Sequence, residues 1–247
     1  MSVLNENTII GASAAGEYEI EQSLRFDDGR GSYLSWTPAS AGNRKTWTWS
    51  GWVKRGNLGI AASLMGANVG FEDALRFEST DILKAYMHDG TSYITQYATD
   101  MLFRDTSAWY HIIWAFDSTN ATEADRSIIY VNGVRVSLTQ VNATTLNGVS
   151  GINNTIPHFT GSSKTSTLYY DGHLAEVNFI DGQALTPDSF GETGDYGEWK
   201  PIAYAGTYGT NGFYLPFEQD YTVEGFSTVT YEGTGATQYI GGTGFSP

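Results

Sequence analysis

Apolar and polar residues alternate along most of the chain from residue 23 onward, and a period of two residues is typical of β-strands. The segment 45–54 shows this alternation most clearly. Its residues Trp47, Trp49 and Val53 fall on one face. Trp52 falls on the opposite face, among small polar residues. Aromatic side chains on both faces predict that both faces are covered, as in an inner strand of a two-layer sandwich.

The same alternation, or a short apolar run, predicts further strands at residues 74–77, 82–88, 93–97, 109–116, 127–131, 134–138, 168–170, 174–180 and 213–217. The segment 109–116 is nearly continuous in apolar residues, which indicates a buried central strand. One short helical turn is expected at 186–190, where Thr186 can act as N-cap and Pro187 takes the first helical position.

Residue pairs that favour tight turns separate the predicted strands. Asn132-Gly133 is the strongest of them and predicts a hairpin with a type I′ turn, and Asp89-Gly90 predicts another. Asp171-Gly172 and Asp181-Gly182 bracket the strand predicted at 174–180. Strand, turn and strand in this order indicate an all-β, antiparallel protein.

The composition agrees with an all-β fold and narrows the range of partners. Aromatic residues make up 14% of the 247 residues and there are 29 glycines, which suits a large core with many turns. The formal net charge is −14, so we expect neither nucleic acid nor an anionic membrane as a partner. The chain has no cysteine, which excludes disulfides and Cys-based zinc sites.

Three parts are expected along the chain: an extended arm at residues 1–22, a β-sandwich at 23–220 and a tail rich in Gly and Thr at 221–247. The arm is small, polar and acidic, with one apolar pair, Ile9 and Ile10. We expect this arm to dock on neighbouring subunits of an assembly. The tail is similar to the start of a further β domain.

Four motifs resemble, in their order along the chain, those of a concanavalin A-like (laminin G-like) domain. They are Trp52-Val53-Lys54, Trp109-Tyr110-His111, Tyr130-Val131-Asn132-Gly133, and the stretch Asp171–Val177 followed by Leu185-Thr186 and Phe190. Their shared order makes the match more specific than any one motif. The resemblance covers about residues 23–220 and implies an antiparallel β-sandwich of the jelly-roll type.

A narrower resemblance links the chain to structural proteins of tailed bacteriophages. It is carried by Ile9–Ser13, Ser23–Phe26 and Arg44–Arg55. This resemblance implies a non-enzymatic protein of the virion surface, such as a tail or head fibre that mediates assembly and attachment to the host. It also implies other virion proteins as partners and a homo-oligomer, with a trimer expected because phage fibres are commonly trimeric.

Aromatic residues on an open sheet face are the sequence's candidates for ligand binding. Tyr86, His88, Tyr93 and Tyr97 lie on two adjacent predicted strands and flank Asp89. Aromatic rings stack on the C–H faces of sugars, while carboxylates accept hydrogen bonds from sugar hydroxyls, so the set suits a host glycan. The alternative is that the tyrosines pack against the second sheet or a subunit interface.

One acidic motif has the spacing of a catalytic set. Glu17, Glu19 and Glu21 alternate, so a strand would place all three carboxylates on one face, as in a group of glycoside hydrolases with this sandwich. The motif lies in the arm, however, ahead of the sheet that would form a cleft. We therefore expect no catalytic residues and no enzymatic activity.

A second acidic motif lies in a Gly-rich loop and contains Glu192, Asp195 and Glu198. Its carboxylates could supply oxygen ligands to calcium, although the loop lacks the dense spacing of a dedicated calcium loop. We expect no other cofactor.

Three functions from different classes stay open at this point. A fibre that attaches to the host predicts binding to a surface glycan. A capsid decoration protein predicts stabilised particles without ligand binding. A glycan depolymerase predicts release of reducing sugar that depends on Glu19 or Glu21.

Overall fold

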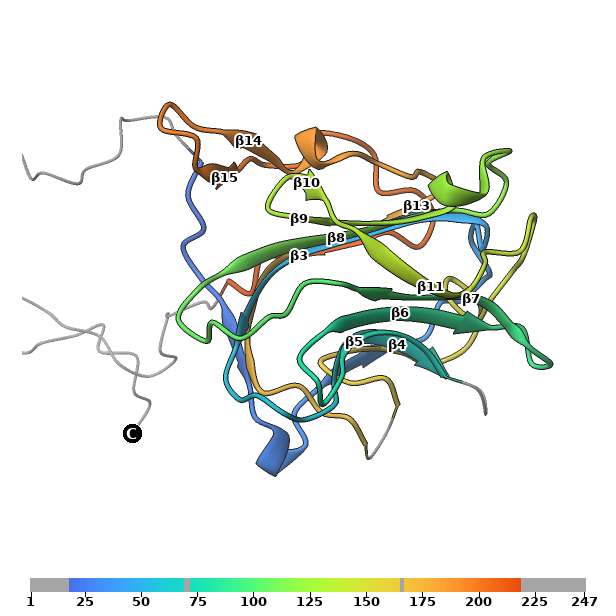
Figure 1. Cartoon of the computed structure of the whole chain (residues 1–247), viewed down its shortest axis with the longest axis horizontal. Helices are drawn as coiled ribbons and strands as arrows, with labels where there is room; N and C mark the ends of the chain where they lie inside the picture. The colour runs from blue at the N-terminus through green and yellow to red at the C-terminus, as the bar shows by residue number, and fades with distance from the viewer. Residues whose placement is uncertain (1–17, 69–71, 165–166, 219–247) are drawn as a thin grey trace, which may run out of the picture. The chain divides into compact units, whose positions relative to one another are not determined.

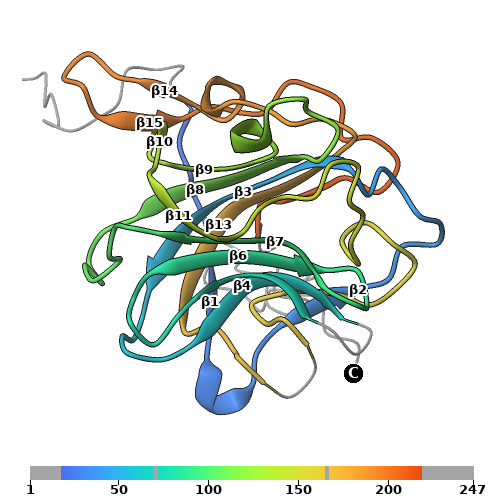
Figure 2. The same cartoon turned by 45° about the vertical axis from the view of Figure 1, so that its right-hand side comes forward.

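The strands form two facing antiparallel sheets in the computed structural model, which describes residues 18–68, 72–164 and 167–218 (Figures 1 and 2). The described residues up to Phe217 belong to one compact unit. The predicted docking pair Ile9 and Ile10 and the tail at 221–247 lie outside the described residues.

Sheet A has seven strands, in the spatial order β1 (Leu24–Phe26), β13 (Gly172–Asp181), β3 (Thr46–Arg55), β8 (Tyr110–Asp117), β9 (Ser127–Val131) and β10 (Val134–Arg135), with β16 (Phe213–Leu215) beside β13. Sheet B has seven, in the order β11 (Leu138–Asn142), β7 (Tyr93–Thr99), β6 (Leu83–His88), β5 (Glu72–Phe77), β4 (Ala62–Asn68), β12 (His158–Thr160) and β2 (Leu34–Trp36).

The remaining elements are short. A separate hairpin consists of β14 (Gly191–Thr193) and β15 (Trp199–Pro201). Three single 3₁₀ turns are η1 (Asp28–Arg30), η2 (Glu123–Asp125) and η3 (Pro187–Ser189). The described residues contain no helix long and apolar enough to cross a membrane.

One apolar core fills the space between the two sheets. The predicted inner face of β3 is confirmed, because Trp47, Trp49 and Val53 are at most 1% exposed and belong to this core. Trp47 packs edge-on against Trp114 of β8, with ring centroids 4.8 Å apart, and stacks on Phe116 at 5.2 Å. Burying one large apolar side chain stabilises a fold by about 1.5–3 kcal/mol, so this cluster anchors the sandwich.

The outer face of sheet A carries a second, smaller apolar cluster. Its buried members are Ile113, Ile180 and Phe190. The chain after β13 crosses this face, and the β14–β15 hairpin lies on the side of sheet A that is turned away from sheet B (Figures 1 and 2). The prediction that β3 is covered on both faces is therefore confirmed over much of its length.

The two predicted glycine hairpins differ in their turns. Val131 pairs with Val134, and the intervening Asn132 and Gly133 have φ angles of 47° and 80°, as a type I′ turn requires. The hairpin at Asp89-Gly90 is also present. The predicted two-residue turn is wrong, however, because His88 pairs with Tyr93 and four residues connect the two strands.

Two predicted strands are corrected by the backbone. The segment 134–138 is not one strand: β10 ends at Arg135 in sheet A, and β11 begins at Leu138 in sheet B. The segment 168–170 is not a strand, because Leu168 has a left-handed φ of 56°. The helical turn at 186–190 is confirmed as η3 with Pro187 first, but the Thr186 side chain makes no capping hydrogen bond.

Candidate ligand-binding site

The predicted glycan-binding residues do not share one face of sheet B. Tyr93 lies edge-on to Tyr86 and His88, with ring centroids 6.2 and 5.1 Å apart. Tyr97 points the other way, because its partner in the ladder is Ala85, a core residue of β6. Only Tyr93 exposes much of its ring, at 46%, whereas Tyr86 is 4% exposed.

Asp89 and Tyr97 are engaged in other local structure. The Asp89 carboxylate accepts hydrogen bonds from the backbone N–H groups of Ser92 and Thr91, both at 2.8 Å, and these bonds lower its pKa. The Tyr97 hydroxyl donates to Glu123 and lines a separate pocket of about 400 Å³. The five residues therefore do not form the single site predicted from the sequence.

The acidic loop around Glu192, Asp195 and Glu198 forms part of the β14–β15 hairpin. The Lys200 ammonium lies 4.0 Å from the Glu192 carboxylate, and the Glu198 carboxylate accepts a hydrogen bond from the backbone N–H of Tyr196 at 3.0 Å. Within the described part of the chain, no three His, Asp or Glu side chains gather in a way that could hold a metal ion. The calcium prediction thus gains no support here.

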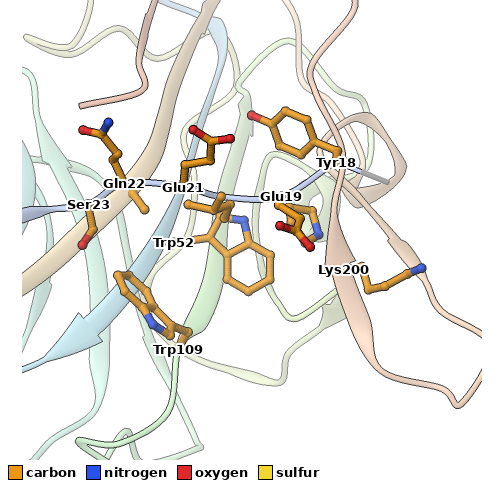
Figure 3. A pocket seen from close by; sticks show the side chains of 11 residues that line it. Tyr18, Glu19, Glu21, Gln22, Ser23, Trp52, Trp109 and Lys200 are labelled. Atoms are coloured by element: carbon orange, nitrogen blue, oxygen red, sulfur yellow. The ribbon is translucent and has the colours of Figure 1, made fainter. Parts of the chain in front are cut away.

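The sequence reasoning missed a pocket of about 520 Å³ on the outer face of sheet A (Figure 3). We call it the tryptophan pocket, and it is lined by Tyr18, Glu19, Ile20, Glu21, Gln22, Ser23, Trp52, Trp109, Ala175, Lys200 and Pro201. Three parts of the chain meet there: the N-terminal stretch 18–23, the outer face of sheet A and strand β15.

The indole ring of Trp52 is held in place by its neighbour in the ladder, His111 of β8. The two rings stack with centroids 4.9 Å apart and 15° between their planes. Trp199 of β15 stacks on His111 at 6.0 Å and 18°. Trp52, His111 and Trp199 thus share a nearly parallel ring orientation on the outer face of sheet A.

Hydrogen bonds fix the state of the His111 ring. The Trp199 Nε1–H group donates to His111 Nδ1 at 2.9 Å, so the ring proton lies on Nε2, which donates to Ser50 Oγ at 2.8 Å. Burial lowers the pKa of His111 to about 3, so the ring is neutral over the physiological range. The His111 ring beneath Trp52 is thus uncharged and hydrogen-bonded at both nitrogens.

Two glycines let the β15 tryptophan approach the sheet. A Cβ at Gly133 would lie 2.5 Å from the Trp199 ring, and one at Gly191 would lie 2.4 Å from it. Both distances are below any real Cβ contact. The glycine of the Asn132-Gly133 hairpin therefore serves the tertiary contact as well as the turn.

The second tryptophan of the pocket, Trp109, lies directly before β8. Its ring meets the edge of His173 on β13, with centroids 6.4 Å apart. Trp109 and Trp52 are both half-buried, in contrast to the core residue Trp114, which is 0% exposed. They therefore offer indole surface to a ligand.

The N-terminal stretch forms the acidic wall of the pocket. Glu19 and Glu21 are exposed and alternate with the half-buried Tyr18 and Ile20, as the sequence predicts for this stretch. Their partner in the acidic motif, Glu17, lies outside the described residues. The predicted single face of carboxylates is not present, because residues 18–23 form no strand and the Glu19 and Glu21 carboxylates lie on opposite sides of this stretch in Figure 3.

A strained residue of sheet A ties this wall down. Glu176 has a φ of 49°, at a bulge where the register of β13 against β3 shifts between Ala175 and Asn178. Its carboxylate accepts hydrogen bonds from the hydroxyls of Tyr18 and, at 2.7 Å, of Tyr214 on β16. Non-glycine residues adopt such angles only where the surroundings enforce them, and they occur often at functional sites.

The family of the chain follows from its sequence profile. The model of the concanavalin A-like lectin/glucanases superfamily matches residues 28–189, which is more than half of the chain. The chain belongs to this superfamily. The matched span contains Trp52 and Trp109, whereas the acidic wall at 18–23 and Lys200 lie outside it.

Solved structures of the same architecture show low sequence identity to this superfamily member. A heptameric SAP-like pentraxin from Limulus polyphemus is 13% identical, with a TM-score of 0.44 over 66% of this chain and 77% of its own. Mouse laminin alpha1 domains LG4-5 are 12% identical, with a TM-score of 0.44 over 64% of this chain and 40% of their own.

The Ruminococcus gnavus sialidase CBM40, solved with α2,3-sialyllactose, is 13% identical, with a TM-score of 0.40 over 57% of this chain and 87% of its own. At such identities the likeness concerns the fold alone. No curated protein sequence matches the chain.

Proposed function

We propose that this lectin-like sandwich is a non-enzymatic surface protein of a bacteriophage virion and that the tryptophan pocket binds a glycan of the host surface. The observation that carries the binding proposal is the pair of half-buried tryptophans, Trp52 and Trp109, in one pocket with carboxylates. The virion part is supported by the resemblance of residues 9–13, 23–26 and 44–55 to phage structural proteins.

The pocket has the properties of a sugar site. Its volume of about 520 Å³ lies within the usual range of small-ligand pockets, about 300–1,000 Å³. Indole faces stack on the C–H groups of a sugar, and Glu19 and Ser23, which point to the side of the indoles in Figure 3, supply groups for its hydroxyls. Because His111 already fixes the Trp52 ring, little side-chain ordering opposes binding.

The carboxylates of the pocket suit binding better than glycoside hydrolysis. A hydrolase of this kind needs a carboxyl group in an apolar setting that keeps it protonated until it acts as the acid. Glu19 and Glu21 are both exposed, so neither has that setting. We therefore propose attachment without cleavage.

A glycan array followed by calorimetry tests the binding proposal. We expect the wild-type protein to retain at least one bacterial surface glycan, and Trp109→Ala to weaken that binding about 30-fold, as truncation of an aromatic anchor commonly does. The control is Tyr196→Ala, because Tyr196 is 97% exposed on the β14–β15 hairpin outside the pocket. An array with no bound glycan, together with particles stabilised by the protein, would favour capsid decoration instead.

A further inference from the structure

We infer that the tryptophan pocket prefers glycans with a free, positively charged amino group over N-acetylated and acidic glycans. This inference rests on the proposed glycan binding and assigns the chemical class of the ligand. The ligand class is then a de-N-acetylated amino sugar within an oligosaccharide.

The charges around the pocket favour a cation. Its lining contains the carboxylates Glu19 and Glu21 and one ammonium group, Lys200. In Figure 3 the Glu19 carboxylate lies on the side of the two indole rings, whereas the Glu21 carboxylate and the Lys200 side chain extend away from them. Lys200 also lies 4.0 Å from Glu192, a carboxylate outside the lining. The lining therefore carries a net negative charge within a chain of net charge −14.

The two tryptophan rings of the pocket also favour a cation. The face of an indole ring has negative electrostatic potential, so it attracts an ammonium group, and Trp binds cations better than Tyr or Phe does. Trp52 and Trp109 both expose part of their rings in the pocket. An acidic sugar would bring its carboxylate against these faces and against the glutamates, which both repel it.

The acidic groups come from a segment outside the common core of the superfamily. The matched span 28–189 includes the two tryptophans of the pocket, but the wall at 18–23 precedes it. The tie between Tyr18 and Glu176 holds that wall against sheet A. The wall thus adds a selective acidic group to an aromatic surface of the sandwich.

Two matched oligosaccharides test the inference by calorimetry at pH 6 and low salt: a β1,4-linked glucosamine tetramer and its fully N-acetylated form. They share one backbone and differ only in the amino groups. We expect the wild-type protein to bind the glucosamine tetramer about tenfold more tightly, which is what one cation–π contact and a nearby carboxylate supply. Higher salt should reduce this preference.

Variants separate local carboxylates from overall charge. The double variant Glu19→Gln with Glu21→Gln should bind both tetramers within about twofold of each other, while Trp109→Ala should weaken binding of both about 30-fold. The control, Asp188→Asn with Asp195→Asn, removes two exposed carboxylates outside the pocket and should keep the preference. Thermal unfolding checks that every variant is folded.

Each outcome decides one of the two proposals. Equal or tighter wild-type binding of the N-acetylated tetramer overturns the amino-group preference but leaves glycan binding intact, as does an array on which acidic or neutral glycans bind best. A preference that persists in the double glutamine variant also overturns the inference. Failure of both tetramers together with an empty array overturns glycan binding itself.

Discussion

Three buried titratable residues have shifted pKa values that make the stability of the sandwich depend on pH. Burial lowers the pKa of His111 to about 3 and of His158 to about 4, from an ordinary value of 6.5. Below pH 6.5 the unfolded chain takes up protons at these histidines and the folded chain does not, so their contribution to stability is lost as pH falls. His158 is held neutral by the N–H of Asn153, which donates to Nε2 at 2.8 Å.

Asp73 changes the pH dependence of the free energy of unfolding in the opposite direction. Burial raises its pKa from 3.8 to about 7, so the folded chain keeps a proton that the unfolded chain releases above pH 3.8. Its contribution is present at low pH and is lost as pH rises through 7. Two histidines outweigh one aspartate, so we expect the free energy of unfolding to fall from pH 6.5 to pH 4.

Urea denaturation at pH 7, 6 and 5 measures this dependence. The variant Asp73→Asn removes the opposing contribution, so we expect its free energy of unfolding to fall more steeply than that of the wild type between pH 7 and 5. Its stability should be lower at every pH, because Asp73 accepts hydrogen bonds from the N–H groups of His88 and Gly151. Equal slopes in the two proteins would contradict the assignment to Asp73.

Gly133 has two roles that a matched pair of variants can separate. Gly133→Ala should lose the freedom to adopt a φ of 80° and also collide with Trp199, whereas Gly59→Ala has a similar φ of 73° and open space around the new Cβ. The backbone cost in each is about 1–2 kcal/mol. We expect chemical denaturation to show a clearly larger loss for Gly133→Ala. A similar loss in both variants would mean that the hairpin moves away from Trp199 freely.

At the scale of elements, the bulge in β13 places the strained residue Glu176 where its carboxylate binds the N-terminal wall of the pocket. Glu176→Gly removes both tyrosine hydrogen bonds and also relieves a positive φ, which costs a non-glycine residue about 1–2 kcal/mol. We therefore expect glycan affinity to fall several-fold while the free energy of unfolding stays the same or rises. Tyr214→Phe keeps the bond from Tyr18 and should have the smaller effect on affinity. Unchanged binding in Glu176→Gly would show that the acidic wall holds its place without this tie.

Most strands of five or more residues were predicted from the sequence, including the bulged β7 and β13, but the seven-residue β4 was missed. Segment 127–131 has five residues in alternation and forms β9 with the predicted bounds. Strands of three residues, such as β2 and β12, contain too few positions for a period of two to be visible. In β7, Ile94 is an extra residue at a bulge, which turns Tyr97 to the opposite face from Tyr93. A count of alternate residues places those two tyrosines on one face, which the structure does not.

The tryptophan pocket could not be derived from local patterns. Trp52 lies on the outer face of β3, as predicted, but the sequence does not show that the cover over this face stops short of its ring. Residues 18–23 are held at the pocket by the hydrogen bond from Tyr18 to Glu176, which lies far away in sequence. The alternation of Glu19 and Glu21 was the only local signal of this wall.

For the whole molecule, the N-terminal region combines two roles that deletions can separate. Residues 18–22 line the pocket, whereas 1–17 contain Ile9 and Ile10 of the predicted docking arm. We expect a variant lacking residues 1–17 to fold and bind glycan but to be absent from particles. A variant lacking 1–22 should lose both glycan binding and incorporation.

Calorimetry and electron microscopy of purified particles measure the two effects. Normal incorporation of the shorter variant would refute the docking role, and glycan binding by the longer deletion would refute the acidic wall. The homo-oligomer expected from the phage resemblance, with three copies, stays a prediction that light scattering can address.

The tryptophans of the sandwich include two classes of intrinsic fluorophore, buried and accessible. Trp47, Trp49 and Trp114 are enclosed in the core and shielded from dissolved quenchers, whereas Trp52 and Trp109 face the pocket. The red-shifted, quenchable part of the intrinsic fluorescence should therefore come partly from the ligand site itself. Binding of a sugar over those two indoles should therefore change the intrinsic fluorescence, so the binding can be measured without a label.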